Sequence, residues 1–338
     1  MPRRAPHHLA LVILNYRTPG LTLDCLDSLA SQVEPDGALS GAEARVETIV
    51  VDNASGDGSA ETIEEGIEAR GLGGWARVLR SPVNGGFAAG NNLGIRAASD
   101  AADAFVLLNS DTLVRPGALA ALLDAMERRP DAGLIGPRFV DGRGRPDVSA
   151  FRQLRPATEL LRGAHTGVLT RLAPGLELPL PVADAPMEPD WLGFACVLVR
   201  REVVERVGLL DEGYFMYFED VDYCNRVRDA GWRILYWPDA EVVHLLGGSS
   251  EHSAEENLHR RAPRYFYEAR ARYFAKFYGR RGLWLANTLW SAGHGLARLR
   301  ELLAHRPPAH RAHEARDLWT NALSPLRPAR TSPHGARA

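Results

Sequence analysis

Four short hydrophobic stretches in the first third of the chain alternate with helix-length segments, and this alternation constrains the fold more than any other feature. The stretches are residues 9–14, 46–51, 77–81 and 105–108, each about as long as a buried strand. Strands that alternate with helices form parallel sheets, because each crossover carries the chain back to the edge where the previous strand began. The pattern predicts an α/β fold with a mostly parallel central sheet and flanking helices.

Each stretch leads into a polar residue suited to a nucleotide, namely Asn15, Asp52, Asn84 and Asp111. In an open parallel sheet the carboxyl ends of the strands share one edge, and ligands bind in the crevice beside that edge. Asn and Asp are also the ordinary residues of turns and helix N-caps, so each residue taken alone has two explanations. Together the four predict a single cleft lined by polar strand ends.

Composition narrows the class of protein. The 338 residues, 45% of them hydrophobic, suffice for one large α/β domain with an appendage or for two ordinary domains. The net charge of −2 argues against a general nucleic-acid binder. Three cysteines without paired spacing fit a reducing, cytoplasmic setting. The N-terminal apolar run is too short for a signal-peptide core or a membrane span, so we expect a cytoplasmic protein.

The pattern changes after residue 137. A turn at 141–144 suggests a hairpin, and the proline-rich stretch 155–189 is expected to be either a long ordered excursion or a mobile loop over the cleft. The elements expected beyond it are a strand at 194–199, a short helix at 202–207, a helix ending near 230, strands at 232–236 and 241–244, and helices at 255–278 and 283–303.

An acidic string, Glu219-Asp220-Val221-Asp222, follows an aromatic run and opens a helix. Carboxylates at a helix N-terminus are favoured by its dipole whatever the function of the protein. Crowding three carboxylates beside aromatic side chains also raises a carboxyl pKa, which suits a general base. Asp222 and Arg226 are four residues apart and can pair across one turn, which leaves Asp220 for chemistry.

Two separate features suggest a cation. Asn109-Ser110-Asp111 ends a strand, and oxygen ligands there suit Mg²⁺ or Mn²⁺ held together with substrate phosphates, although a plain turn would have the same sequence. His244 closes a later apolar strand, where a lone histidine is more often structural. If the two strand ends are neighbours, imidazole and carboxylate could share the cation.

The loop from Asn84 to Asn91 is rich in glycine, so its backbone can approach a ligand closely, and the helix that follows favours anions. The loop lacks the Gly-Lys-Ser/Thr ending of a P-loop. The first strand leads into Asn15-Tyr16-Arg17-Thr18-Pro19 without a Gly-x-Gly-x-x-Gly sequence. This absence argues strongly against a dinucleotide dehydrogenase.

In their order and spacing these motifs resemble those of family 2 glycosyltransferases, most closely the rhamnosyltransferase-like branch that builds bacterial surface polysaccharide. The resemblance spans roughly residues 9–278. It is carried by Leu14-Asn15-Tyr16, Val50 to Ser55, Asn84 to Asn91, Leu108 to Asp111, Asp190-Trp191-Leu192-Gly193 with Ala195, Phe215 to Asp222, and Val243-His244. It implies a GT-A fold, a dTDP- or UDP-sugar donor, a divalent cation and inversion at the anomeric carbon.

The resemblance also implies residue roles on the donor side. Asp52 would read the pyrimidine base, and Asn15 with Asn84 would help to hold the nucleoside. The other residues it assigns to the donor are Tyr16, Arg17, Gly86, Asn91, Asn109, Ser110 and Asp111. Asn109 and Asp111 match the Asp-x-Asp metal motif, and His244 matches a histidine that completes the metal site in some relatives. Because Asn109 is a neutral, weaker ligand, we expect modest metal affinity that depends on the bound diphosphate.

On the acceptor side, Asp220 matches the catalytic base, with Glu219 beside it. Trp191, Gly193 and Asp222 would border the acceptor or sugar pocket. Asp220 would take the proton from a hydroxyl of a glycan or lipid-linked acceptor as that oxygen attacks C1 of the donor sugar. A catalytically inactive nucleotide- or glycan-binding module and a nucleotidyltransferase remain as alternatives.

The expected domain plan is a catalytic domain over 1–250, with a nucleotide-binding half at about 9–137 and an acceptor half at about 138–250. A helical extension follows over 251–305, and the tail 306–338 is expected to be disordered. The helix at 255–278 interleaves arginines with aromatic residues. It either packs on the catalytic domain or makes peripheral contact with anionic lipid on the inner face of the cytoplasmic membrane, where a lipid-linked acceptor would be presented.

Overall fold

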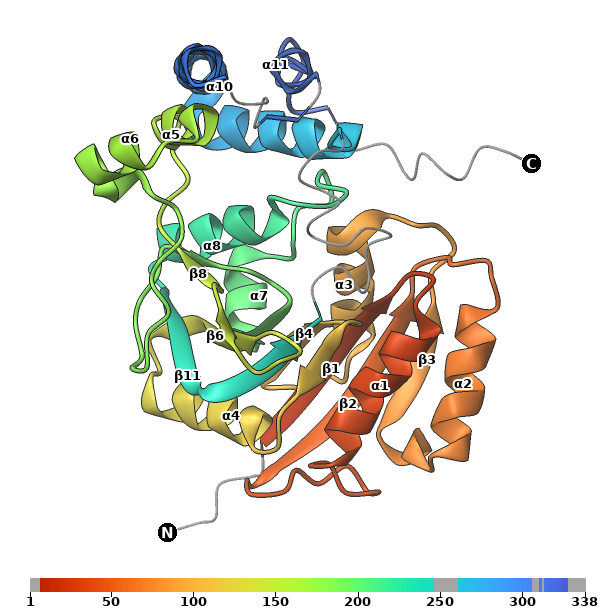
Figure 1. The fold of residues 1–338 in the computed structure, drawn as a ribbon. Coiled ribbons are helices and arrows are strands. Elements are labelled where there is room, and N and C mark those ends of the chain that lie inside the picture. The colour runs from red at the N-terminus through yellow and green to blue at the C-terminus, as the bar shows by residue number, and fades with distance from the viewer. Residues whose placement is uncertain (1–6, 246–260, 306–309, 312, 328–338) are drawn as a thin grey trace.

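The computed structural model describes residues 7–245, 261–305, 310–311 and 313–327 (Figure 1). Its first half contains β1 (His7–Asn15), α1 (Pro19–Ala30), β2 (Ala44–Asp52), α2 (Ser59–Ala69), β3 (Ala76–Arg80), α3 (Gly86–Ala97), β4 (Ala104–Asn109), β5 (Thr112–Val114), α4 (Ala118–Arg128) and β6 (Ala132–Val140). Its second half contains β7 (Pro146–Asp147), β8 (Ala150–Phe151), α5 (Thr158–Ala164), α6 (Gly167–Leu172), β9 (Trp191–Leu192), β10 (Cys196–Arg200), α7 (Arg201–Val207), α8 (Glu219–Asp229), β11 (Arg233–His244), α10 (Arg264–Leu303) and α11 (Glu314–Asp317).

The central sheet has the strand order β3-β2-β1-β4-β10-β6-β11-β5, with β7 paired to β6. The first four strands of this order run parallel to one another, and β1 and β2 are in register from His7 opposite Ala44 to Asn15 opposite Asp52. The alternation in the sequence therefore predicted these strands correctly. All their carboxyl ends reach the same edge, as expected for parallel strands.

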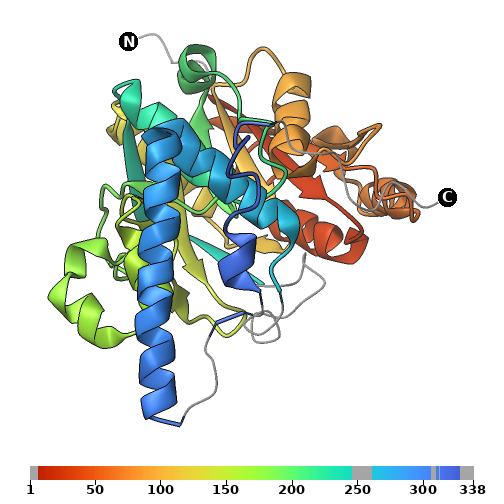
Figure 2. The ribbon, with the colours of Figure 1, turned by 90° about the horizontal axis from the view of Figure 1, so that it is seen from above.

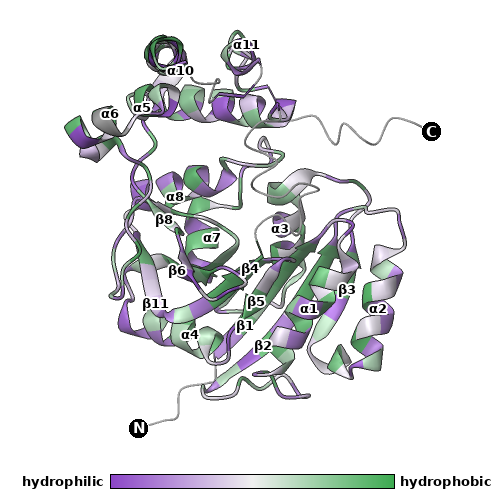
Figure 3. Ribbon diagram, viewed as in Figure 1, coloured by the Kyte–Doolittle hydropathy of each residue, from purple (hydrophilic) through white to green (hydrophobic). Residues whose placement is uncertain are grey.

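Helices cover both faces of the sheet (Figures 1 and 3). One core lies between the sheet and α1, α2 and α4, and a second core lies between the sheet and α3, α7 and α8. Strands that are buried on both faces are apolar along their whole length. Residues 9–13 of β1 accordingly have no exposed surface.

The second half of the sheet mixes directions. β10 inserts antiparallel between β4 and β6, whereas β6 and β11 run parallel. The expected hairpin forms between β6 and β7. The two strands expected at 232–236 and 241–244 are one strand, β11, with a register shift between Trp237 and Glu241. Pro238 within the shift has no N–H for the ladder, so pairing is interrupted while the strand continues.

Of the two alternatives expected for the proline-rich stretch 155–189, an ordered excursion or a mobile loop, the structure shows the ordered excursion. It contains α5, α6 and a 3-10 turn over Pro174–Leu176, and α5 packs against α10. Proline and glycine interrupt these elements often enough that no long periodic pattern is visible in the sequence.

α10 consists of two helical segments, 264–278 and 280–303, joined at Gly279, whose φ of 68° and ψ of 177° are not helical (Figure 2). They correspond to the two expected helices, except that the first begins at Arg264 and that residues 255–260 lie outside the described part of the chain. In the first segment Tyr267, Tyr273 and Phe274 are buried, so its aromatic side chains pack on the protein.

Part of the tail expected to be disordered is folded. α11 is followed by turns, and Leu318 and Ala322 are buried. Arg261 holds this segment through two hydrogen bonds of 2.6 and 2.7 Å to Asp317. Residues 306–309, 312 and 328–338 of the expected tail lie outside the described residues. No helix among the described residues is long and apolar enough to cross a membrane.

A buried ion pair joins α5 to both segments of α10. The Arg270 Nη2 donates to Glu159 Oε2 at 2.7 Å, and its Nη1 donates to Asn287 Oδ1 at 2.6 Å. Arg270 and Glu159 are 1% and 2% exposed. Arg162 also pairs with Glu159, at 2.8 Å. A buried arginine that loses its carboxylate cannot regain water, so this network is a sensitive point of the C-terminal region.

We expect Glu159→Ala to lower the free energy of unfolding by about 3–5 kcal/mol, because it leaves Arg270 buried without a counter-charge. The matched control is Asp124→Ala, which removes the exposed pair with Arg128 at 2.9 Å. That change should cost about 0.3–0.5 kcal/mol. Urea denaturation of both variants measures the difference, and equal losses would contradict the prediction.

Candidate functional site

The carboxyl ends of β1 and β2 form one polar corner of the site. Asn15 Nδ2 donates to Asp52 Oδ1 at 2.8 Å, and Ser55 donates to the same carboxylate from Oγ at 2.5 Å and from its backbone N–H at 3.2 Å. Asn15 and Asp52 are 0% and 5% exposed. The structure thus brings these two predicted residues together, and three donors fix the orientation of the Asp52 carboxylate.

The turn after β1 is held by the same asparagine. Asn15 Oδ1 accepts hydrogen bonds from Thr18 N at 3.2 Å and Thr22 Oγ1 at 3.0 Å. Arg17 adopts a left-handed φ of 59°, and its N–H donates to Ser55 Oγ at 2.9 Å. Its exposed guanidinium lies 5.2 Å from the centre of the Tyr16 ring. Tyr16 and Arg17 therefore project from a rigid turn at the sheet edge.

Asn53 joins this corner to the glycine loop. Its Nδ2 donates to Asn84 Oδ1 at 3.0 Å and to the Gly86 carbonyl at 3.1 Å, and Asn84 Oδ1 also accepts from Gly86 N at 3.0 Å. Sequence reasoning did not single out Asn53, although it directly follows Asp52. Its position directly after the strand-end residue Asp52 was the sequence feature that could have identified it.

The glycine loop also touches the segment before the acidic string. Phe87 N donates to the Phe215 carbonyl at 2.7 Å. Gly86 has a φ of 83°, and a Cβ at this position would collide with the backbone of Phe215. Only glycine permits this approach at low cost, so the loop is glycine-rich partly for packing against the second half of the chain.

Two asparagines of α3 lie in the interior. Asn91 is 1% exposed and donates to the Phe87 carbonyl at 3.0 Å within its own helix. Asn92 donates to the Leu210 carbonyl and to Glu212, each at 2.9 Å. The structure therefore gives both side chains contacts within the protein, and donor binding by Asn91 stays a prediction.

The strand-end triplet of β4 lies beside the same corner. Ser110 Oγ is 3.0 Å from Thr18 Oγ1 in the turn after β1, and Asn109 N donates to the Ala195 carbonyl at 2.9 Å. Asp111 is 2% exposed. Ser110 thus links the end of β4 to the turn after β1, at the same edge of the sheet as Asn15 and Asp52.

His244 and Asp111 are neighbours, as expected if their strands end side by side. β5 and β11 pair antiparallel with His244 opposite Thr112, and His244 Nε2 lies 3.6 Å from Asp111 Oδ1. Burial lowers the pKa of His244 and so favours the neutral imidazole, although the Asp111 charge opposes this. A neutral imidazole and a carboxylate are suitable ligands for Mn²⁺ or Mg²⁺.

Asp111 and His244 alone do not complete the coordination shell of a metal ion. Among the described residues, no three side chains of His, Cys, Asp or Glu are close enough to hold a metal ion. Mg²⁺ usually keeps waters and phosphate oxygens as its other ligands. Asp111 and His244 therefore fit a cation that binds together with a diphosphate.

The acidic string follows a strained turn. Tyr217 and Phe218 have left-handed φ values of 71° and 67°, which cost roughly 1–3 kcal/mol for each residue other than glycine. Phe218 packs against Phe266 and Tyr273 of α10, with ring centres 5.5 and 5.8 Å apart. This packing holds the turn and fixes where Glu219 and Asp220 begin α8.

Asp222 lies in the interior between α8 and α10. It is fully buried and accepts hydrogen bonds from Arg226 Nε at 2.8 Å and Tyr214 Oη at 3.1 Å. Lys276 Nζ of α10 lies 2.6 Å from Asp222 Oδ2, the same oxygen that accepts from Tyr214. The expected pair with Arg226 is confirmed. A place for Asp222 at the acceptor pocket stays a prediction, since its carboxylate is already neutralised by two cations.

Glu219 and Asp220 have different environments. Glu219 is 6% exposed, its Oε2 has no hydrogen-bond partner among the described residues, and burial raises its pKa well above the usual range. Asp220 is partly exposed, and burial raises its pKa to about 6. A carboxylate with that pKa is ionised at neutral pH yet accepts a proton more readily than an ordinary aspartate.

Trp191 is fixed by its neighbours. Its ring stacks on Phe151 with centres 4.0 Å apart, and its Nε1 donates to the Arg152 carbonyl at 2.8 Å. Gly193 N donates to the Ser149 carbonyl at 3.0 Å. The short β8–β9 ladder thus presents a half-buried indole, whose contact with substrate stays a prediction.

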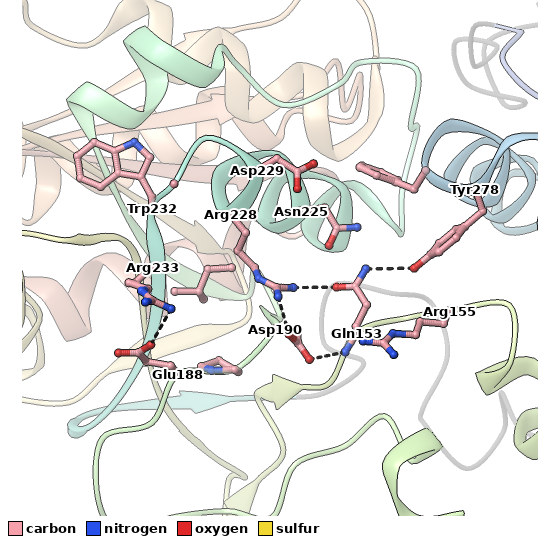
Figure 4. A pocket seen from close by; sticks show the side chains of 14 residues that line it. Gln153, Arg155, Glu188, Asp190, Asn225, Arg228, Asp229, Trp232, Arg233 and Tyr278 are labelled. Carbon is pink, nitrogen blue, oxygen red and sulfur yellow. Dashed lines mark hydrogen bonds and ion pairs between the residues drawn. The ribbon is translucent and has the colours of Figure 1, made fainter.

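A polar cavity of about 850 Å³ lies at the other end of α8 (Figure 4). Asn225, Arg228 and Asp229 of α8 line it, with Gln153 and Tyr278 opposite. None of the residues predicted to bind donor, metal or acceptor lines this cavity. Asn225, the first residue of α8 to line the cavity, follows Asp220 by five residues, which is roughly 8 Å along the helix axis.

Comparison with known proteins reveals clear relatives. Residues 10–169 match the profile of the family described as Glycosyl transferase family 2. The chain is 33% identical over 230 residues to an N-acetylglucosaminyl-diphospho-decaprenol L-rhamnosyltransferase of Mycobacterium tuberculosis strain CDC 1551, an alignment that covers 64% of this chain and 72% of that protein. It is 25% identical over 191 residues to the dTDP-rhamnosyl transferase RfbF of Shigella flexneri, covering 55% and 58% of the two chains.

The fold has a counterpart among solved structures. A crystal structure of GalNAc-T7 with UDP, GalNAc and Mn²⁺ superposes with a TM-score of 0.58 at 15% identity, covering 89% of this chain and 59% of that one. This similarity confirms the expected GT-A architecture of a mostly parallel, curled sheet followed by C-terminal helices.

The contact between Gly86 and Phe215 can be tested through stability. We expect Gly86→Ala to lower the free energy of unfolding by more than Gly117→Ala, since a Cβ at Gly86 collides with backbone whereas a Cβ at Gly117 meets open space. The two glycines have almost the same φ, 83° and 85°, so the shared strain cancels in the comparison. Overpacking typically costs about 1–3 kcal/mol. Equal denaturation midpoints would show that the contact is unimportant.

Proposed function

This chain belongs to glycosyltransferase family 2, and we propose that it transfers a sugar, rhamnose, from a dTDP- or UDP-activated donor to a hydroxyl of a glycan or lipid-linked acceptor in the synthesis of bacterial surface polysaccharide. The observation that carries the proposal is the backbone contact between the glycine loop and Phe215. It connects the polar strand ends to the acidic string that begins at Glu219. The rhamnosyltransferase names of the two relatives support the choice of sugar.

On the donor side, the Asp52 carboxylate would accept the ring N–H of a thymine or uracil base. Asn15 and Ser55 donate two short hydrogen bonds to Asp52 Oδ1, whereas within the described part of the chain Oδ2 receives only the longer 3.2 Å bond from Ser55 N. A carboxylate oxygen has several acceptor positions, so Oδ2 can accept one more proton donor. The rigid surroundings would reduce the entropy lost when the base binds.

On the acceptor side, Asp220 would act as the general base. It takes the proton from the acceptor hydroxyl while that oxygen bonds to C1 of the donor sugar, and the bond from C1 to the diphosphate oxygen breaks on the opposite face. The product is inverted, and the nucleoside diphosphate leaves with the electron pair. Asp222 is already paired with Arg226 and Lys276, so it competes poorly for that proton.

Asp111 and His244 would hold a divalent cation with the donor diphosphate. When bound, such a cation offsets the charge that develops on the leaving diphosphate. Asp111 lies nearly buried at the sheet edge, and the imidazole of His244 is positioned 3.6 Å from it. Mn²⁺ in the structure of GalNAc-T7 supports the choice of cation.

The first test is replacement of the base. We expect Asp220→Asn to bind donor normally but to lose at least about 100-fold in turnover, because general-base catalysis is typically worth roughly 10² to 10⁴ in rate. Asp229→Asn, an exposed change at the other end of the same helix, is the control and should keep full turnover. Release of free dTDP or UDP from the sugar donor measures the reaction. If the unaltered chain released pyrophosphate instead, it would be a nucleotidyltransferase. If the unaltered chain bound donor without any turnover, it would be a binding module.

The pH profile distinguishes Asp220 from its neighbour. Protonated Asp220 cannot accept the proton of the hydroxyl, so kcat/KM should fall about tenfold per pH unit below the Asp220 pKa of about 6. Asp229→Asn should keep this slope, and the residual activity of Asp220→Asn should lose it. A slope that persists in Asp220→Asn, or turnover that is unchanged, would assign the base to Glu219 or Asp222.

Metal dependence is tested by calorimetric titration of dTDP and UDP with and without Mn²⁺. We expect Mn²⁺ to strengthen binding and His244→Ala to weaken the Mn²⁺-dependent part by about tenfold or more, by analogy with the loss of residues that support a metal site. His8→Ala, at the opposite end of β1, should leave both values unchanged. Equal affinity with and without Mn²⁺ would contradict the proposed cation site.

A further inference from the structure

Most of the large apolar side chains that are exposed in the described structure lie in the C-terminal helical region. Only Val83, Leu172, Val182 and Tyr217 lie elsewhere. The others are Trp284, Leu285, Leu296, Leu299, Leu302, Leu303, Trp319, Leu323 and Leu326, with exposed fractions from 42% to 75%. Such a concentration on a folded protein marks a surface that contacts a partner or a membrane.

The second segment of α10 has two apolar faces. Leu283, Ala286 and Trp290 belong to the inner face and have no exposed surface. The outer face, which we call the outer stripe, consists of Leu285, Leu289, Ala292, Leu296, Leu299 and Leu303. These residues recur at alternating spacings of four and three, which places them along one side of a helix. The stripe is about 27 Å long at 1.5 Å per residue.

The outer stripe is bordered by positive charge alone. The segment 280–303 contains four arginines, at 280, 281, 298 and 300. Its one acidic residue, Glu301, is 3% exposed and pairs with Arg298 at 3.0 Å. The acidic residues of α11, Glu314 and Asp317, are likewise buried and paired with arginines. This face therefore presents apolar and cationic groups without an exposed carboxylate in either helix.

Two tryptophans extend the same surface. Trp284 of α10 and Trp319 after α11 are 49% and 42% exposed, and their rings meet edge to face with centres 5.6 Å apart. Leu323 and Leu326 follow in the same turn segment. α10 and α11 form the outermost layer on one side of the molecule (Figures 1 and 2). Half-exposed tryptophan beside leucine and arginine is typical of residues at a membrane–water interface.

We propose that the outer stripe, together with Trp284 and Trp319, lies in the surface of an anionic lipid bilayer. The charge of the surface favours lipid over a second copy of this chain, since pairing two outer stripes would bring arginines together without carboxylates to offset them. The proposal rests on the proposed function in one respect: the bilayer surface is where the enzyme would bind a lipid-linked acceptor.

This surface differs from the one expected from the sequence. The aromatic residues of the first segment, 264–278, pack inward, so that segment has little to offer a membrane. The first segment also packs against α8, the helix that carries Asp220, because its Lys276 contacts Asp222 of α8. A bilayer that contacts the second segment of α10 would thus be joined to the proposed base, Asp220, through the first segment and α8.

The test is co-sedimentation of the full chain with vesicles of phosphatidylcholine, alone or mixed with phosphatidylglycerol. We expect clear binding only to the mixed vesicles. Arg281→Gln should weaken that binding about fivefold, from roughly 1 kcal/mol per arginine. Leu296→Gln combined with Leu299→Gln should weaken it at least tenfold, because two apolar side chains would no longer be buried in the bilayer. Val182→Gln, an exposed apolar residue outside the C-terminal helices, should have no effect.

Two further measurements separate the outcomes. Sugar transfer to a short, water-soluble acceptor should be unchanged in the Leu296→Gln, Leu299→Gln variant, which shows that the variant is folded. If the unaltered chain transferred no sugar, the proposed function would be rejected, and vesicle binding would still be tested independently. Equal binding to neutral and anionic vesicles, or a dimer in light scattering that the double variant dissociates, would overturn the membrane proposal.

Discussion

The arrangement of the site depends on one close approach between two backbones, the hydrogen bond from Phe87 N to the Phe215 carbonyl. Gly86 makes this approach feasible because it has no Cβ and adopts a positive φ. The contact joins the start of α3, which follows the polar strand ends, to the strained turn that precedes α8. The groups that we propose to bind the donor and to accept the proton are far apart in the sequence, and this contact fixes their separation, which an enzyme that joins two substrates requires.

The three acidic residues in the first turn of α8 illustrate how environment assigns different roles to similar carboxyl groups. Asp222 is neutralised by Arg226 and by Lys276, the chain's sole lysine, so it contributes to packing between α8 and α10. Glu219 is buried without a hydrogen-bond partner for one oxygen among the described residues, which favours its protonated form. Asp220 retains partial exposure and a moderately raised pKa. A neutral Glu219 would remove one like charge from beside Asp220 and so keep Asp220 ionised near neutral pH.

Periodicity predicted β1 to β4 well, since strands buried on both faces are apolar throughout and end where polar residues begin. The contact between Asp111 and His244 was expected only if their two strands ended side by side, and the structure meets that condition. The insertion of β10 between β4 and β6 could not be predicted, because a short apolar strand carries no signal of its neighbours. The roles of Asn53 and Lys276 depend on contacts between distant segments, and the packing of residues 313–327 depends on the pair between Arg261 and Asp317. Composition alone cannot reveal such contacts.

Gly279 explains how one long helix can serve both the catalytic domain and an outer surface. Its φ of 68° breaks α10 into two segments, and a Cβ there would meet open space, so the glycine is required by backbone conformation and not by crowding. The first segment directs its aromatic residues and Lys276 inward, where they support α8. The second segment changes direction and packs its inner face against α5, while its Asn287 accepts a hydrogen bond from Arg270 of the first segment. Among the described residues, its outer stripe stays exposed. A straight helix of the same sequence would have to continue along the axis of the first segment, and its outer stripe would then take a different orientation relative to Asp220.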